Sequence, residues 1–347
     1  MTMNDEPSQP SGPSTATPPA TAGGADRWDR YWAHGFVTSC ALAFAANYEG
    51  RMRGVWDAFF TALAPGARIL DICTGNGAIA VIANEVSRDA GKGFEIHGVD
   101  RAQIDPHGTL KIDPALLAGI RFHARTPAER TPFADGSFDA VVGQYALEYT
   151  DVPATCREIG RILKPGGRCV FVVHHDTSII LETGREELRH ARLLFEETRL
   201  FERARALMER MAGARTAAER LALADDPDAE EKRQSLNAAA ADATAAIERS
   251  PHPEMLRTAL GHISRAFRSL DEGGSESALA QLAAAEADIR ANEARLRDLL
   301  EAARDADGMA AMGDAMTAAG LEPAAPAPLL HEPGRLVGWT LEAVRRS

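Results

Sequence analysis

Cysteine and long apolar runs are both scarce in this chain. Its 347 residues include 4 cysteines, which show no paired spacing and so argue against a disulfide framework. They are Cys40, Cys73, Cys156 and Cys169. No apolar run is long enough to span a bilayer, and the first residues lack the basic stretch and apolar core of a signal peptide. We therefore expect a cytoplasmic protein that does not enter a membrane.

Basic residues are also few relative to acidic ones. Lys and Arg total 38 against 50 Asp and Glu, which gives a formal net charge of -12. This balance disfavours a broad phosphate-binding surface, so nucleic acid is not an expected partner. Hydrophobic residues make up 45% of the chain, enough to bury one sizeable core and to carry an additional module.

The most informative stretch is a glycine turn between two apolar segments. A β-prone run over Ala67–Ile72 precedes it, and Ala78–Val86 after it has the composition of a helix. Residues 71–77 read Asp-Ile-Cys-Thr-Gly-Asn-Gly. Gly75 and Gly77 lack a Cβ, so they accept positive φ and let the backbone approach a ligand near a helix N-terminus. A purely structural turn uses the same residues, so this stretch alone leaves the question of a ligand open.

Three later segments extend the pattern. Phe94–Asp100 is predicted as a strand ending in an acid 25 residues after Gly75, the position from which a carboxylate binds ribose hydroxyls. Residues 128–142 are predicted to form a loop, a turn and another strand, and Cys156–Leu163 a helix closed by Lys-Pro-Gly-Gly. A further strand follows over Arg168–Val173. The alternation of strands and helices predicts an α/β doubly wound sheet.

Together these motifs resemble the class I S-adenosylmethionine-dependent methyltransferases, in particular their small-molecule, methyltransferase type 11-like branch. The resemblance covers Trp28–His175 and the residues from Gly308 onward. It implies a Rossmann-like seven-stranded sheet with six parallel strands and an antiparallel last strand. Ala324–Leu330 and Leu336–Val344 resemble the final hairpin of that sheet.

The resemblance also implies S-adenosylmethionine as the cofactor and assigns residues to it. The glycine turn would hold its amino-acid end, the acid after strand two and the neighbouring arginine its ribose, and the loop before strand four its adenine. The first residue after strand four would contact the methionine part through its backbone. The residues concerned are Asp71, Cys73, Gly75, Gly77, Asp100, Arg101, Ala128, Glu129 and Gln144.

Two positions depart from the family pattern, and one upstream segment adds to it. Cys73 stands where the motif begins its glycine series, which narrows the space for the cofactor's carboxylate. Pro127 replaces the acid that pairs with the adenine amine, unless Glu129 supplies that bond. In related enzymes a leader folds over the cofactor, so Tyr31 and Trp32 are weak candidates to line the site, against ordinary core packing.

Residues after strands four and five are candidates for the acceptor side. His174 and His175 end strand five, and an imidazole with a pKa of roughly 6.5 suits a base that assists a hydroxyl acceptor. Neighbouring residues on a strand point to opposite sides, so only one of the two is expected to face the acceptor. Tyr145, Glu148 and Tyr149 are candidate substrate contacts, with loop packing as the alternative. No metal site is predicted.

The composition changes along the chain and predicts its organisation. Residues 1–25 are rich in Pro, Ser, Thr, Gly and Ala and are expected to be a disordered tail. The methyltransferase domain is expected over 26–177, with a short buried helix at Val37–Ala46. It resumes over 308–347 with a helix at Met309–Ala319.

The intervening residues 178–307 are predicted as a helical insertion after strand five. Ala, Leu, Glu and Arg dominate it, and apolar residues recur on one face of three or four helices, as in a coiled coil. Breaks are expected at 225–227, 250–253 and 272–274, where Pro or Gly occurs. We expect this part to close over the substrate as a lid or to form a homodimer, roles that are compatible.

The sequence therefore predicts a methyltransferase that moves a methyl group to a small or medium-sized acceptor by in-line displacement. A nicotinamide dehydrogenase is disfavoured because a third glycine and a Tyr-x-x-x-Lys pair are absent. An amine methyltransferase of nucleic acids is disfavoured because Gly-Gln-Tyr-Ala stands where Asn/Asp-Pro-Pro-Tyr/Phe is expected. The alternative kept open is an inactive methyltransferase-fold scaffold that acts through its helical insertion.

Overall fold

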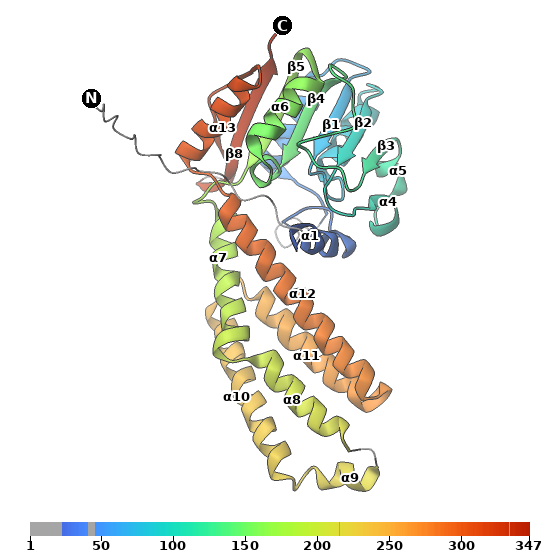
Figure 1. Cartoon of the computed structure of the whole chain (residues 1–347), viewed down its shortest axis with the longest axis vertical. Helices are drawn as coiled ribbons and strands as arrows, with labels where there is room; N and C mark the ends of the chain where they lie inside the picture. Colours follow the sequence, from blue (N-terminus) through green and yellow to red (C-terminus); the bar gives the residue numbers. More distant parts are fainter. Residues whose placement is uncertain (1–22, 41–45, 215, 333) are drawn as a thin grey trace, which may run out of the picture.

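The computed structural model describes residues 23–40, 46–214, 216–332 and 334–347. It consists of a sheet domain and a long helical arm that leaves the sheet domain on one side (Figure 1). The predicted disordered tail lies outside the described residues except for Gly23–Ala25, which begin the first helix. Within the described residues, no helix combines the length and apolar character needed to cross a bilayer.

One mixed sheet forms the centre of the sheet domain. Its strands are β1 (Arg68–Ile72), β2 (Glu95–Val99), β3 (Ile120–His123), β4 (Phe138–Gln144), β5 (Leu163–Val173), β6 (Leu321–Pro323), β7 (Ala327–Glu332) and β8 (Arg335–Arg345). The order is β3-β2-β1-β4-β5-β8-β6, with β1 to β5 parallel and β8 antiparallel to β5. The predicted doubly wound topology is confirmed. The expected final hairpin is β7–β8, and within the described residues the extra strand β7 pairs with β8 alone.

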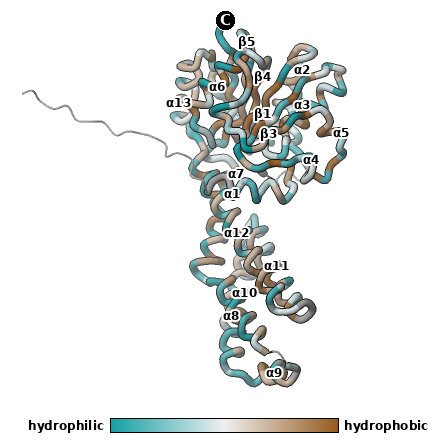
Figure 2. Tube along the Cα trace, turned by 45° about the vertical axis from the view of Figure 1, so that its right-hand side comes forward, coloured by the Kyte–Doolittle hydropathy of each residue, from teal (hydrophilic) through white to brown (hydrophobic). Residues whose placement is uncertain are grey.

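Side chains along each strand point alternately to the two faces of the sheet. Apolar side chains lie on both faces, and helices cover both. Ile69 and Val142 pack with α2 (Gly50–Ala62) and α3 (Ala78–Asp89) on one face. Leu70 and Val141 pack with α6 (Val152–Ile162) and α13 (Ala306–Ala318) on the other. Figure 2 shows the apolar residues concentrated in the central strands. The short helices are α4 (Pro106–Thr109), α5 (Pro114–Leu117) and the 3₁₀ turn η1 (Leu147–Tyr149).

The helical arm, residues 179–302, lies between β5 and α13 in the chain. Its elements are α7 (Ile179–Arg192), the π-helical turn η2 (Leu193–Glu197), α8 (Leu200–Ala212), α9 (Ala217–Ala222), α10 (Pro227–Arg249), α11 (Glu254–Gly273) and α12 (Ser275–Ala302). The arm has an apolar core of its own, with Leu194, Phe201, Leu256 and Leu282 buried together. The helices α7 and α12 join the arm to the sheet domain, and the far part of the arm extends away from it (Figure 1).

The predicted breaks in the arm are confirmed, and an additional one appears. Asp226 caps α10 by accepting hydrogen bonds from the amides of residues 228 and 229, and Pro227 occupies the first turn. The break between η2 and α8 was not predicted, because Arg199 takes φ +50° there without any Gly or Pro to signal it. The arm thus contains more and shorter helices than the three or four expected.

The remaining helix, α1 (Gly23–Ala33), lies between the sheet domain and the upper end of the arm (Figures 1 and 2). The buried helix predicted at Val37–Ala46 is wrong for its described part, because residues 37–40 form bends and turns. Asn76 Nδ2 donates hydrogen bonds to the carbonyls of Trp32, at 3.0 Å, and Phe36, at 2.8 Å. These tertiary bonds fix the segment after α1 in a non-helical path.

Candidate active site

The glycine turn lies at the carboxyl end of β1 and leads directly into α3. Cys73, Gly75 and Gly77 all have positive φ, at +48°, +54° and +88°. Cys73 therefore takes a backbone conformation that usually belongs to glycine, at an energetic cost of the order of 1 kcal/mol. Burial raises the pKa of its thiol well above the ordinary value, so the thiol stays protonated. The turn therefore has the positive φ angles expected at Gly75 and Gly77, although Cys73 stands where the family pattern begins its glycine series.

Asp71 holds this turn from the inside. Its Oδ2 accepts a hydrogen bond from Thr74 Oγ1 at 2.5 Å, and the Ala80 amide also bonds to the carboxyl group. The side chain is only 1% exposed, and burial raises its pKa to about 7. The Asp71 carboxyl group thus links the turn to α3 through hydrogen bonds. Its predicted contact with the cofactor stays a prediction.

Asp100 follows β2 and meets the glycine turn, and its predicted contact with a ribose stays a prediction. Its Oδ2 accepts from the Gly75 amide and its Oδ1 from the Ala102 amide, both at 2.8 Å. Burial raises its pKa to about 6, and these amide bonds partly oppose that rise. A carboxylate offers about four acceptor positions, so each oxygen retains capacity for a ligand hydroxyl.

The predicted adenine loop also gathers at this edge of the sheet. Arg101 Nη2 donates to Glu129 Oε1 at 2.8 Å, and the Asp151 amide donates to the same oxygen at 3.2 Å. Glu129 Oε2 is buried without a hydrogen-bond partner among the described residues. Ala128 is buried beside them at 5% exposure. The loop therefore presents one unused carboxylate oxygen.

Gln144 ends β4 and is fixed by a buried tryptophan of α2. Trp56 Nε1 donates to Gln144 Oε1 at 2.5 Å. The Gln144 side chain also forms a hydrogen bond with Tyr48. The side chain thus has a fixed position.

The predicted acceptor-side residues come together around His174. The rings of Tyr145 and His174 stack with centroids 3.8 Å apart and an interplanar angle of 2°, and the Tyr149 ring approaches His174 edge-on at 6.0 Å. Glu148 Oε1 accepts from the His174 amide at 2.8 Å. Tyr145 Oη donates to the Val337 carbonyl at 3.0 Å, so that hydroxyl is already engaged.

Two polar atoms in this cluster lack partners among the described residues. They are His174 Nδ1 and Glu148 Oε2, on side chains that are 2% and 3% exposed. Burial, with a smaller contribution from the Arg295 charge, lowers the pKa of His174 well below its ordinary value. Burial raises the pKa of Glu148 to about 7. The imidazole is therefore neutral at pH 7, and burial makes it a weaker base than a free imidazole.

His175 points elsewhere, as strand alternation predicted. Its ring stacks on Trp339 with centroids 4.3 Å apart, and its Nδ1 lies 2.8 Å from Asp176 Oδ1. The structure brings His174, and not His175, together with Tyr145, Glu148 and Tyr149.

Sequence reasoning missed a contribution from the arm. Arg295 of α12 reaches this region, where its guanidinium lies 4.8 Å from the Tyr31 ring centroid and its Nη1 donates to the Ser39 carbonyl at 3.4 Å. Nothing in the sequence distinguishes Arg295 from the other two arginines of that helix, Arg290 and Arg297. Trp32, a candidate from the sequence, lies against the glycine turn. A Cβ built on Gly75 would lie 2.3 Å from its indole.

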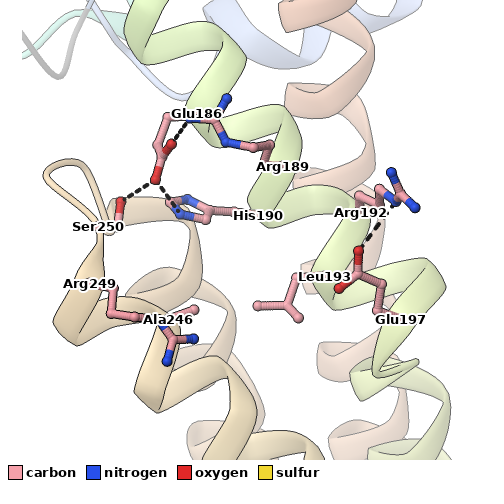
Figure 3. Close-up of a pocket in the computed structure, with 9 residues that line it drawn as sticks. All are labelled: Glu186, Arg189, His190, Arg192, Leu193, Glu197, Ala246, Arg249 and Ser250. Atoms are coloured by element: carbon pink, nitrogen blue, oxygen red, sulfur yellow. Dashed lines mark hydrogen bonds and ion pairs between the residues drawn. The ribbon is translucent and has the colours of Figure 1, made fainter.

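A separate cavity of about 400 Å³ lies on the arm, between α7, η2 and α10 (Figure 3). Its lining is largely self-paired, since Glu186 Oε1 accepts from Ser250 Oγ at 2.9 Å and lies 3.3 Å from His190 Nε2, and Arg192 pairs with Glu197. None of the site residues described above lines it. The unused polar atoms described above lie instead at the sheet edge, which is therefore the candidate site. Within the described ranges, no three His, Cys, Asp or Glu side chains gather as metal ligands.

Comparison with known proteins adds relatives of stated activity. The ubiquinone/menaquinone biosynthesis C-methyltransferase of Geotalea daltonii is 33% identical over 111 residues, which are 31% of this chain and 46% of that protein. The 2-phytyl-1,4-naphtoquinone methyltransferase of Synechococcus elongatus is 31% identical over 121 residues, which are 33% of this chain and 49% of that protein. The chain spans about half the length of these curated relatives.

A solved structure of geranyl diphosphate C-methyltransferase from Streptomyces coelicolor is 22% identical, with a TM-score of 0.33, and covers 44% of this chain and 65% of that one. The family model described as "Methyltransferase domain" matches residues 44–219, just over half of the chain. That range includes the glycine turn, Asp100, Glu129 and His174. The chain therefore belongs to the class I S-adenosylmethionine-dependent methyltransferases, enzymes whose methyl donor is S-adenosylmethionine.

Proposed function

We propose that this chain methylates a small aromatic acceptor that carries a hydroxyl group. The observation that supports this most is the neutral, buried His174 with an unused Nδ1, stacked on Tyr145 at the carboxyl end of β5. Glu148, with its unused Oε2, lies beside it. Two relatives are named as quinone methyltransferases, which favours an acceptor of this ring type.

The residues beside Gly75 and Asp100, at the edge of the sheet, carry chemical groups that can bind S-adenosylmethionine. Asp100 offers carboxylate oxygens to a ribose, and the unused Glu129 Oε2 can accept the bond that Pro127 cannot make to an adenine amine. The space above Gly75 does not fit it in this conformation, because the Trp32 indole already lies there. When bound, the cofactor would supply an electrophilic methyl group.

In this proposal His174 acts as the base. Its Nδ1 takes the proton from the acceptor hydroxyl, which raises the electron density of the oxygen or ring carbon to be methylated. Tyr145 keeps the imidazole plane fixed through stacking, and Glu148 holds the His174 backbone through Oε1. Tyr149 presents its ring edge to His174 and forms a wall for a flat acceptor.

The position of Trp32 on Gly75 gives specific support to a second candidate, the inactive scaffold. A chain that never releases Trp32 would not bind the cofactor and would act through its arm. Isothermal titration with S-adenosylhomocysteine separates the two functions. Measurable binding supports the enzyme, and no binding by folded protein supports the scaffold.

The acceptor proposal is tested with radiolabelled S-adenosylmethionine and a panel of phenols, each paired with its methoxy analogue. We expect label transfer to phenols only. His174→Gln should lower kcat by about 10²- to 10⁴-fold and remove the fall of kcat/KM at low pH, with unchanged affinity for S-adenosylhomocysteine. His175→Gln is the matched control and should keep the wild-type pH profile. An unchanged profile in His174→Gln would show that His174 is not the base.

A further inference from the structure

We propose that α1 is a built-in plug of the cofactor crevice, that the helical arm latches it there, and that cofactor binding requires its release. This rests on the proposed function only in taking the crevice beside Gly75 and Asp100 as the cofactor site. We call the segment 27–36, which comprises most of α1 and the three residues after it, the plug. We call the face of α12 that contacts this segment the latch.

The first observation is where Trp32 lies. Its indole covers Gly75 so closely that a Cβ on that glycine would be 2.3 Å from the ring, and the side chain is only 7% exposed. Asn76, inside the glycine turn, donates to the carbonyls of Trp32 and Phe36. The turn that should receive a ligand thus binds the chain's own N-terminal segment.

The second observation is that α1 engages the loops after the other parallel strands as well. Asp29 Oδ1 accepts from the Gln103 amide at 2.6 Å in the loop after β2, and Asp29 pairs with Arg125 at 2.6 Å in the loop after β3. Trp28 meets Tyr149, after β4, edge-on at 5.8 Å. In sheets of this type ligands bind in the crevice formed by these loops, so α1 occupies the place of a ligand.

The third observation is the latch. Arg27 pairs with Asp298 at 2.9 Å, and Arg30 pairs with Asp288 at 3.1 Å, both across the contact between α1 and α12. These pairs are partly exposed, so salt weakens them. Movement or binding at the arm can therefore change how often the crevice is open.

In this proposal the cofactor binds only molecules in which α1 is released. The apparent affinity for the cofactor is therefore the intrinsic affinity multiplied by the fraction of such molecules. Replacing Trp32 therefore changes cofactor affinity in one direction if Trp32 is a block and in the opposite direction if it is a ligand contact. If Trp32 blocks the crevice, its removal tightens cofactor binding. If α1 instead closes over bound cofactor with Trp32 as a contact, its removal weakens binding.

The test is calorimetric titration of S-adenosylhomocysteine into the full chain and three variants. Trp32→Ala should bind about tenfold tighter or more, because it frees the surface of Gly75. The double variant Asp288→Asn with Asp298→Asn leaves the crevice intact and should bind about 2- to 20-fold tighter. Glu293→Gln is the matched control. It removes another α12 ion pair, with Arg297, and should leave affinity unchanged.

Salt gives a second readout that does not depend on Trp32→Ala folding. Raising the salt concentration should tighten binding in the wild type and have less effect in the double variant, whose latch is already removed. Weaker binding by Trp32→Ala, or equal measurable affinity in the double variant and the wild type, overturns the plug. Absence of binding in all four proteins overturns the proposed function and the plug together.

Discussion

Replacing Glu148 with glutamine should stabilise the sheet domain relative to the wild type, by an amount that grows as the pH rises. Glu148 is 3% exposed, and its Oε1 accepts from the His174 amide. Burial raises its pKa from 4.5 to about 7, although the Arg304 charge and nearby amides oppose the rise. Glutamine keeps an oxygen for the His174 amide and cannot ionise.

The sign follows from the order of the two pKa values. Below pH 4.5 the carboxyl is protonated in both the folded and the unfolded chain, so its ionisation carries no penalty. Between pH 4.5 and about 7 the unfolded chain loses this proton first, and the folded state loses stability as the pH rises. Above that range the loss is complete. Between pH 5 and 8.5 the wild type should therefore lose about 2 kcal/mol relative to the glutamine variant.

Tryptophan fluorescence in urea measures this difference in the sheet domain. All 4 tryptophans lie at Trp28, Trp32, Trp56 and Trp339, outside the arm, so the signal reports on the sheet and α1. Glu322→Gln changes an exposed glutamate of β6 in the same way and serves as control. A stability difference between Glu148→Gln and wild type that does not change with pH would refute the reasoning.

Three other substitutions probe the crevice and its support. Asp100→Asn should weaken S-adenosylhomocysteine binding by about 10- to 100-fold in calorimetry, because charge-assisted bonds to the ribose are lost; unchanged affinity would remove the ribose assignment. Trp56→Phe should lower the free energy of unfolding by about 1–3 kcal/mol, measured in urea, since Gln144 Oε1 loses its buried donor. Gly77→Ala should be destabilising by more than 1 kcal/mol, because φ is +88° and the new Cβ would lie 2.7 Å from the Phe122 ring; a wild-type melting temperature would contradict this.

The sheet and the proximity of the glycine turn to the end of β2 could be predicted because their signals are local or follow from topology. The glycine turn and its flanking apolar runs lie within one stretch of sequence. Parallel strands then bring their carboxyl ends together, which is why Gly75 and Asp100 meet although 25 residues separate them. The choice between His174 and His175 required side-chain contacts.

The rest depends on contacts between distant segments. The aromatic content of the leader predicts burial but not that Trp32 covers Gly75. The Arg and Glu residues of the arm repeat with the same helical spacing, so the sequence could not show that Arg295 reaches the Tyr31 ring. The bends after α1 arise from bonds to Asn76, which no local pattern signals.

A crystal structure of the full chain with S-adenosylhomocysteine tests the central claim most directly. The account predicts that the adenosyl group lies against Gly75 with its ribose on Asp100, and that the Trp32 indole has moved off the glycine. Density for the ligand at another place, with Trp32 still covering Gly75, would contradict it.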